Sequence, residues 1–212
     1  MLASAQQMSE RSVGEREAKN AKLAQTAGAW QACSKHASRA LNAGIEIDNT
    51  ATPLAWYKGI ALQHSGQTTK ALEILLEAVE RNPYHITLLS DIGGCYAMLG
   101  NRAKSIEYYE RALSVTPCFP DAIRNLSVVY LQSNRTADAC TVLEGQCLRE
   151  RMHLPEYQEV INAVFQQRLL EWQREGRFLS IQPDQVFEHF KASVAGNCSF
   201  EAQLTLYLDE HD

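Results

Sequence analysis

The sequence repeats itself at an interval of 34 residues, and this period limits the fold more than any other feature of the chain. Gly59 is followed by Gly93, and Pro83 by Pro117, each pair at the same interval. A fixed period of this length predicts similar structural units stacked along the chain. The other matched positions are Gly66 and Gly100, Ala78 and Ala112, Tyr96 and Tyr130, and the series Ala71, Ser105 and Ala139, with Asn134 at the position of Gly66 and Gly100.

Apolar side chains within each interval recur with the spacing of an amphipathic helix rather than a strand. We expect Gly66, Gly100 and Asn134 to end one helix of each unit in the left-handed conformation. Pro83 and Pro117 then end the second helix, because proline has no amide hydrogen to continue it. Small residues are predicted where the paired helices approach closely, and these are Gly59, Gly93, Ala71, Ala78 and Ala112.

The glycines of the stretch from Asn82 to Asn101 do not indicate a phosphate-binding loop. Such a loop needs a strand before it and a helix N-terminus after it. The residues before Gly93 have helical spacing, and no Lys-Ser or Lys-Thr pair follows Gly100. We therefore interpret these glycines as structural.

The matched positions resemble the tetratricopeptide repeat, a helix-turn-helix unit with a small residue and an aromatic residue on its first helix and alanines and a closing proline on its second. The resemblance implies an all-α fold, a helical-hairpin solenoid of about three to four repeats with a helical C-terminal cap. We expect units at 52-85, 86-119 and 120-153. The third departs from the pattern, because Ser127 replaces the glycine, Gln146 replaces the last alanine and no proline closes it.

The two ends of the chain are also predicted to be helical. Residues 1-51 are expected to form an N-terminal helical region, and Ala37, Leu41 and Gly44 suggest a degenerate repeat within it. Trp30 and Leu41 are expected to face the first clear unit. Residues 154-212 are expected to cap the solenoid, although a separate small module or docking element is the alternative. Its first helix begins near Glu156, shorter ones follow from 183 and after 199, and the apolar face of the first carries Val160, Val164, Leu169 and Trp172.

Composition argues against several classes of protein. A net charge of -5 and a pI near 5.7 do not favour nucleic acid as a partner. No apolar run approaches the length of a membrane span, and the first residues lack the apolar core of a signal peptide. Six scattered cysteines without a CxxC pair suggest reduced thiols and, with them, a soluble cytoplasmic chain without direct membrane insertion.

No arrangement typical of an enzyme is recognisable. Cys33 and His36 lie one helical turn apart and could supply half of a metal site, but two ligands do not make a site. The other histidines form no HExxH or comparable motif. We expect a protein that is not an enzyme and that needs no metal or cofactor.

What remains is a binding surface. In tetratricopeptide proteins the first helices of successive units line a concave groove, and the resemblance implies that such a groove binds a peptide or segment of a partner protein. Solvated helix faces are the alternative interpretation. Asp91 would repel an acidic tail, so a chaperone clamp is not favoured. The groove would be lined by Trp56, Tyr57, Ile60, His64, Ser90, Asp91, Gly94, Met98, Arg124, Asn125, Val128 and Gln132.

A second hypothesis concerns the context of the chain. The phrases NPYHITLLSDIGGCYAMLGN and FPDAIRNLSVVYLQSNR are similar to the tetratricopeptide tails of bacterial O-antigen polymerase or ligase-like membrane proteins. This resemblance implies a soluble segment attached to an inner-membrane protein and involved in surface polysaccharide assembly. The chain would then be a fragment.

Overall fold

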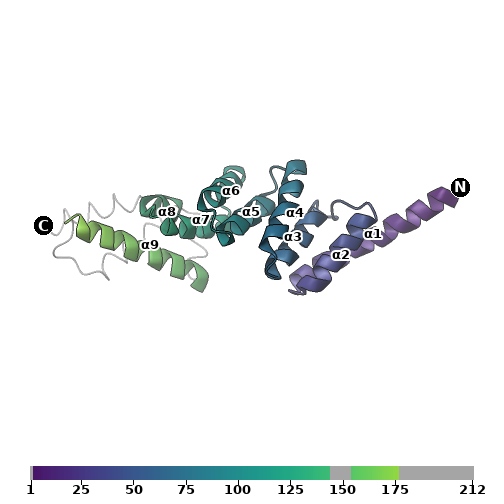
Figure 1. The fold of residues 1–212 in the computed structure, drawn as a ribbon, viewed down its shortest axis with the longest axis horizontal. Coiled ribbons are helices and arrows are strands. Elements are labelled where there is room, and N and C mark those ends of the chain that lie inside the picture. The colour runs from purple at the N-terminus through teal and green to yellow at the C-terminus, as the bar shows by residue number, and fades with distance from the viewer. Residues whose placement is uncertain (1, 144–153, 177–212) are drawn as a thin grey trace. The chain divides into compact units, whose positions relative to one another are not determined.

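The computed structural model describes residues 2–143 and 154–176, and their regular structure is helical apart from an isolated bridge between Ile47 and Pro53 (Figure 1). The all-α prediction is confirmed. The helices of these residues are α1 (Leu2–Thr26), α2 (Trp30–Asn42), α3 (Leu54–His64), α4 (Thr68–Arg81), α5 (Ile86–Met98), α6 (Arg102–Val115), α7 (Pro120–Gln132), α8 (Thr136–Leu143) and α9 (Pro155–Arg174).

The chain divides into two compact units, Met1–Lys104 and Ser105–Asp212, and the division falls within α6. We describe each unit by itself. The boundaries proposed from the sequence at 52 and 154 stay predictions.

In the first unit, α1 packs on α2 and α3 on α4, and α5 follows beside α4. Gly59 marks the close approach within the second pair, because a Cβ atom placed there would lie 2.5 Å from Cδ2 of Leu75. Gly93 is buried in α5. The core of this unit is apolar, and its largest fully buried side chains are Leu54, Leu75, Leu88, Leu89 and Ile92.

The turns between paired helices have the backbone conformation that the repeat predicts. Gly66 and Gly100 both have φ +76°, and Asn134 has φ 56°. Helices α4 and α6 end at Arg81 and Val115, two residues before Pro83 and Pro117. These predictions are confirmed, and the conformation explains why glycine or asparagine stands at each turn.

The N-terminal hairpin differs from the predicted degenerate repeat in one respect. Gly44 lies beyond the end of α2 with φ +76°, so it is a turn residue and does not pack between helices. Ala37 is fully buried in α2 as a packing residue should be. Trp30 stacks on His64 of α3 with 3.7 Å between ring centroids, which confirms that Trp30 faces the first clear unit.

In the second unit, α7 pairs with α8, and α9 packs on both. Helix α9 is the predicted helix near Glu156, and its expected apolar face, from Val160 to Trp172, is buried. Proline opens α7 at Pro120 and α9 at Pro155, where the missing amide hydrogen costs nothing. The helices predicted from 183 and after 199, together with Gln146, lie outside the described residues.

The cysteines do not all match the expectation of free thiols. Cys33, Cys95 and Cys140 are free and buried. Cys118 is disulfide-bonded, so the expectation was wrong at this position. Cysteine usage therefore does not indicate a reducing compartment for this chain.

Candidate functional site

Two side-chain contacts join α3 and α5 along one face of the first unit. Trp56 Nε1 donates a hydrogen bond to Oδ2 of Asp91, and Gln63 Nε2 donates to Sδ of Met98 at 3.5 Å. Both pairs are 35 residues apart, so they join nearly equivalent positions of successive repeats. Ile60 on α3 and Gly94 on α5 come between the two contacts in the sequence of each helix. We call the face formed by these residues and His64 the α3/α5 face.

The α3/α5 face is closed at one end and open at the other. Trp56 is only 9% exposed and its indole holds the Asp91 carboxylate. At the other end Met98 is 60% exposed, and His64, stacked on Trp30, is also exposed. Apolar and aromatic surface therefore reaches solvent near the C-terminal ends of α3 and α5.

Tyr57 does not lie on this face, and its prediction as a groove residue is corrected. The side chain is 2% exposed, and its hydroxyl donates to Oδ2 of Asp48 at 2.8 Å. Burial, together with the Asp48 carboxylate, raises the pKa of Tyr57. The Tyr57 ring packs edge-on against Trp56 with 4.9 Å between the ring centroids, and its burial removes it from the surface. Ser90 is buried too.

Asp48 organises the segment that leads into α3, and sequence reasoning missed it. Its Oδ1 accepts hydrogen bonds from the backbone amides of Thr50 and Thr52 at 2.8 and 2.9 Å and from the Thr50 hydroxyl at 2.7 Å. Burial favours the neutral acid, but the hydrogen bonds outweigh it and lower the pKa of Asp48. The sequence signal that could have identified Asp48 is an aspartate with threonines two and four residues later. This pattern is typical of turns in which a side chain accepts hydrogen bonds from nearby backbone amides.

The remaining predicted groove residues lie on α7 in the second unit. Arg124, Asn125 and Val128 are partly buried, and Gln132 is exposed. The Arg124 guanidinium lies 5.9 Å from the centre of the Tyr157 ring of α9. The predicted groove therefore divides into residues of two units, and only the α3/α5 set is joined by the contacts described above.

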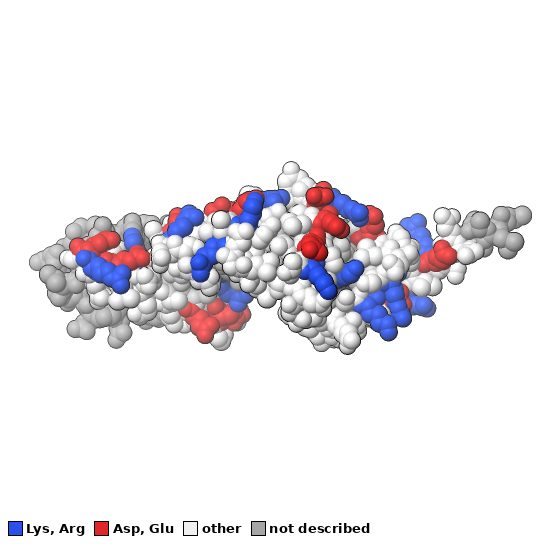
Figure 2. All heavy atoms as spheres, in the orientation of Figure 1, with Lys and Arg blue, Asp and Glu red and all other residues white. Residues whose placement is uncertain are grey.

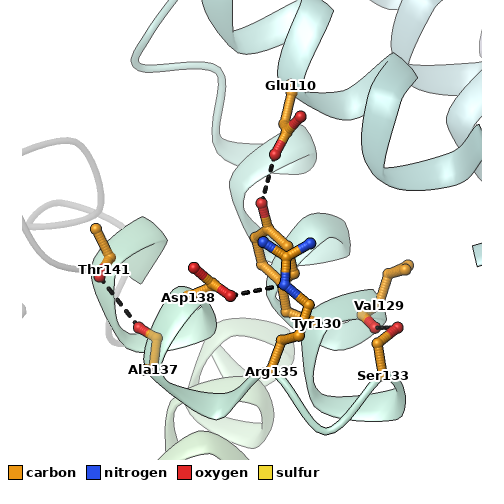
Figure 3. Close-up of polar contacts among 8 residues, drawn as sticks. All are labelled: Glu110, Val129, Tyr130, Ser133, Arg135, Ala137, Asp138 and Thr141. Atoms are coloured by element: carbon orange, nitrogen blue, oxygen red, sulfur yellow. Dashed lines mark hydrogen bonds and ion pairs between the residues drawn. The ribbon is translucent and has the colours of Figure 1, made fainter. Parts of the chain in front are cut away.

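The second unit has its own polar cluster around Tyr130 (Figure 3). The Tyr130 hydroxyl donates to Glu110 Oε1 at 2.6 Å, and the Arg135 guanidinium covers the ring at 4.5 Å. Arg135 Nε in turn donates to Asp138 Oδ2 at 2.7 Å. Burial and Glu110 raise the pKa of Tyr130, so its hydroxyl remains protonated and acts as a donor. This cluster fixes the turn at Asn134.

Cys33 and His36 do not form a metal site. The Cys33 thiol faces the Tyr57 carbonyl oxygen at 3.5 Å, and burial raises its pKa to about 11. The His36 ring contacts Glu17 through Nδ1 at 2.6 Å. In the part of the chain that the structure describes, no three metal-binding side chains come together.

Two further observations concern the charge of the surface and the hydropathy of the helices. Figure 2 shows acidic and basic side chains interspersed over the visible face instead of gathered by sign. None of the described helices combines the length and the apolar character that crossing a membrane requires.

Comparison with known protein families agrees with the fold described above, in which paired helices are joined by short turns. Residues 49–117 match the family model described as tetratricopeptide repeat. Residues 49–117 of this helical chain thus form tetratricopeptide repeats. Such repeats are typically scaffolds without catalytic activity.

Among curated proteins, the chain is similar to photosystem I assembly protein Ycf3 from Cyanophora paradoxa, with 33% identity over 85 residues, which is 38% of this chain and 49% of the relative. Ycf3 from Rippkaea orientalis is 32% identical over 75 residues, covering 34% of this chain and 43% of the relative. The chain thus spans about half the length, or slightly less, of these curated relatives.

Among solved structures, PilF of Pseudomonas aeruginosa aligns with a TM-score of 0.64 and 15% identity over 90% of this chain and 80% of PilF. YrrB, described as having an unusual peptide-binding site, aligns with a TM-score of 0.55 and 20% identity over 67% of this chain and 71% of YrrB. At these identities the likeness shows the fold alone.

Proposed function

We propose that this protein is a non-catalytic interaction module that binds an extended segment of a partner protein on the α3/α5 face. The observation that carries the proposal is the pair of contacts Trp56–Asp91 and Gln63–Met98, which hold the two helices together on one partly open face. A surface held in place before binding loses less conformational entropy when a ligand arrives.

The chemistry of the face indicates what kind of segment it suits. Ile60 offers an apolar contact, and Gly94 adds no side chain to the neighbouring helix, so we propose that an apolar side chain of the partner packs at this point. Met98 extends the apolar surface and adapts to different shapes because its side chain is flexible. The Asp91 carboxylate disfavours acidic segments, because like charges repel.

The comparisons support a role in holding other proteins. The name of Ycf3 states an assembly function, and YrrB is described as having a peptide-binding site. We propose by analogy that this chain holds a partner during assembly of a larger complex. The hypothesis of an O-antigen polymerase tail receives no support from the relatives described above, and we do not include it in the proposal.

A peptide library displayed on phage and selected on the wild-type chain tests the proposal. We expect the selected peptides to carry an apolar residue beside a basic or hydrogen-bond-donating one. Gly94→Trp should weaken their binding at least about tenfold, because it fills the site of the apolar residue. Glu73→Trp, on the exposed side of α4, is the matched control. Equal binding to both variants would place the binding surface elsewhere.

A further inference from the structure

Helix α1 extends beyond its partner helix. It runs from Leu2 to Thr26 over 25 residues, whereas α2 has 13. Gly14 packs against the segment after α2, where an added Cβ would lie 2.6 Å from Cγ1 of Ile45. Residues 6–13 are all exposed, and Figure 1 shows this end of α1 projecting past α2. We call residues 6–13 the α1 overhang.

A groove runs between α1 and the segment that follows α2. Its volume is about 1160 Å³, and residues 43–49 form its second wall. Two exposed apolar side chains stand on opposite walls, Met8 with 74% exposed and Ile47 with 56% exposed. A helical segment about 10 Å across and about 15 Å long occupies on the order of 1200 Å³, so the groove has the size of one such segment.

The face of α1 that lines this groove is complementary to itself. Met8, Arg11, Glu15 and Ala18 follow the alternating spacing of three and four that places residues on one stripe of a helix. The stripe is symmetric about Val13. In an antiparallel pair of α1 helices centred there, the exposed Arg11 of one copy faces the exposed Glu15 of the other, and Met8 lies over the small, buried Ala18. Two-fold interfaces require this kind of self-complementarity.

We infer that the α1 overhang of a second copy of this chain fills the groove and that the protein forms an antiparallel two-fold dimer through α1. Met8 of each copy then lies against Ile45 and Ile47 of the other. Arg11 and Glu15, an exposed pair 3.3 Å apart within one helix, gain a second partner across the interface. The contact is short, so the dimer is expected to be weak and concentration-dependent.

Charge reversal distinguishes this dimer from effects within a single helix. Arg11→Glu alone places two acids opposite each other, and Glu15→Arg alone places two arginines opposite each other. Each variant should dimerise at least about tenfold more weakly than the wild type. An equimolar mixture of the two variants restores opposite charges across the interface but not within either helix. Dimers should therefore return in the mixture.

Sedimentation equilibrium of the full chain from micromolar to millimolar concentration measures the effect, with a dimer at twice the chain mass of 23.8 kDa. Glu77→Arg on the exposed face of α4 is the control and should behave as the wild type. Circular dichroism checks that helix content is unchanged. A wild type that stays monomeric overturns the inference. A mixture that associates no better than its components does so too.

Discussion

The two units each bury a tyrosine whose hydroxyl meets a carboxylate, but they do so by different routes. In the first unit Tyr57 donates to Asp48, which is itself 7% exposed and accepts three further hydrogen bonds. In the second, Tyr130 donates to Glu110, which is exposed on α6 (Figure 3). The two tyrosines stand at different positions of the repeat, and their acceptors Asp48 and Glu110 are not among the matched positions, so the polar contacts do not repeat with the backbone.

The small-residue position of the repeat shows the same divergence. Gly59 lies against Leu75 with no room for a side chain. Ser127, 68 residues later, is fully buried yet carries a Cβ and a hydroxyl that donates to the Ile123 carbonyl oxygen at 2.9 Å. The third hairpin therefore accommodates a slightly larger residue by satisfying its polar atom within its own helix.

Removing the two carboxylates should give the largest difference between the units. Asp48→Ala leaves two backbone amides and the Tyr57 hydroxyl without their acceptor, so the first unit should lose about 3 kcal/mol or more. Glu110→Ala removes an acceptor at an exposed position, where water can replace it beside the Tyr130 hydroxyl. The second unit should therefore lose less than about 1 kcal/mol of stability. Urea denaturation with hydrogen exchange resolved by segment measures both. Similar losses of stability in the two units would show that burial does not make the hydrogen bonds of Asp48 more stabilising than that of Glu110.

Changing the small residues is expected to have the next largest effect. Gly59→Leu should destabilise the first unit by about 1–3 kcal/mol, because Leu75 must move to make room. Ser127→Ala removes only a hydroxyl whose partner carbonyl keeps its helical hydrogen bond, and should change stability by less than about 1 kcal/mol. The same denaturation measurement applies. Tolerance of leucine at 59 would show that the α3–α4 contact is not tight.

The smallest effect is expected at the start of α5. His85 Nδ1 accepts the Leu88 amide hydrogen bond at 3.2 Å, and burial lowers the pKa of His85. The neutral ring is therefore favoured in the folded state, and its contribution to stability is present above about pH 6.5 and is lost as the pH falls through the lowered value. The loss should be no more than about 1 kcal/mol.

Helix α7 provides the comparison for this cap, since Phe119 at the equivalent position makes no side-chain hydrogen bond. His85→Asn keeps a capping acceptor without a group that titrates in this range. Hydrogen exchange at the first turn of α5 should then depend less on pH than in the wild type. An unchanged pH dependence would assign the titration to another group.

Part of the candidate site could be predicted from the sequence. The period alone placed Ile60, Gly94 and Met98 on first helices of successive units, since helical spacing decides which positions share a face. It could not show that Tyr57 turns into the core toward Asp48. That outcome depends on Asp48, which precedes the first predicted unit.

The paired helices of the clear repeats, the turns between them and the tight contact at Gly59 could be read from the amino-acid order. Those features follow from short-range constraints: positive φ at Gly66, Gly100 and Asn134, the missing amide hydrogen of proline, and apolar spacing. The three-dimensional fold was needed to find that Trp56 donates a hydrogen bond to Asp91, that α1 is longer than α2 and that Cys118 is disulfide-bonded. Such contacts join residues far apart in the chain, and no local preference of either partner specifies the other.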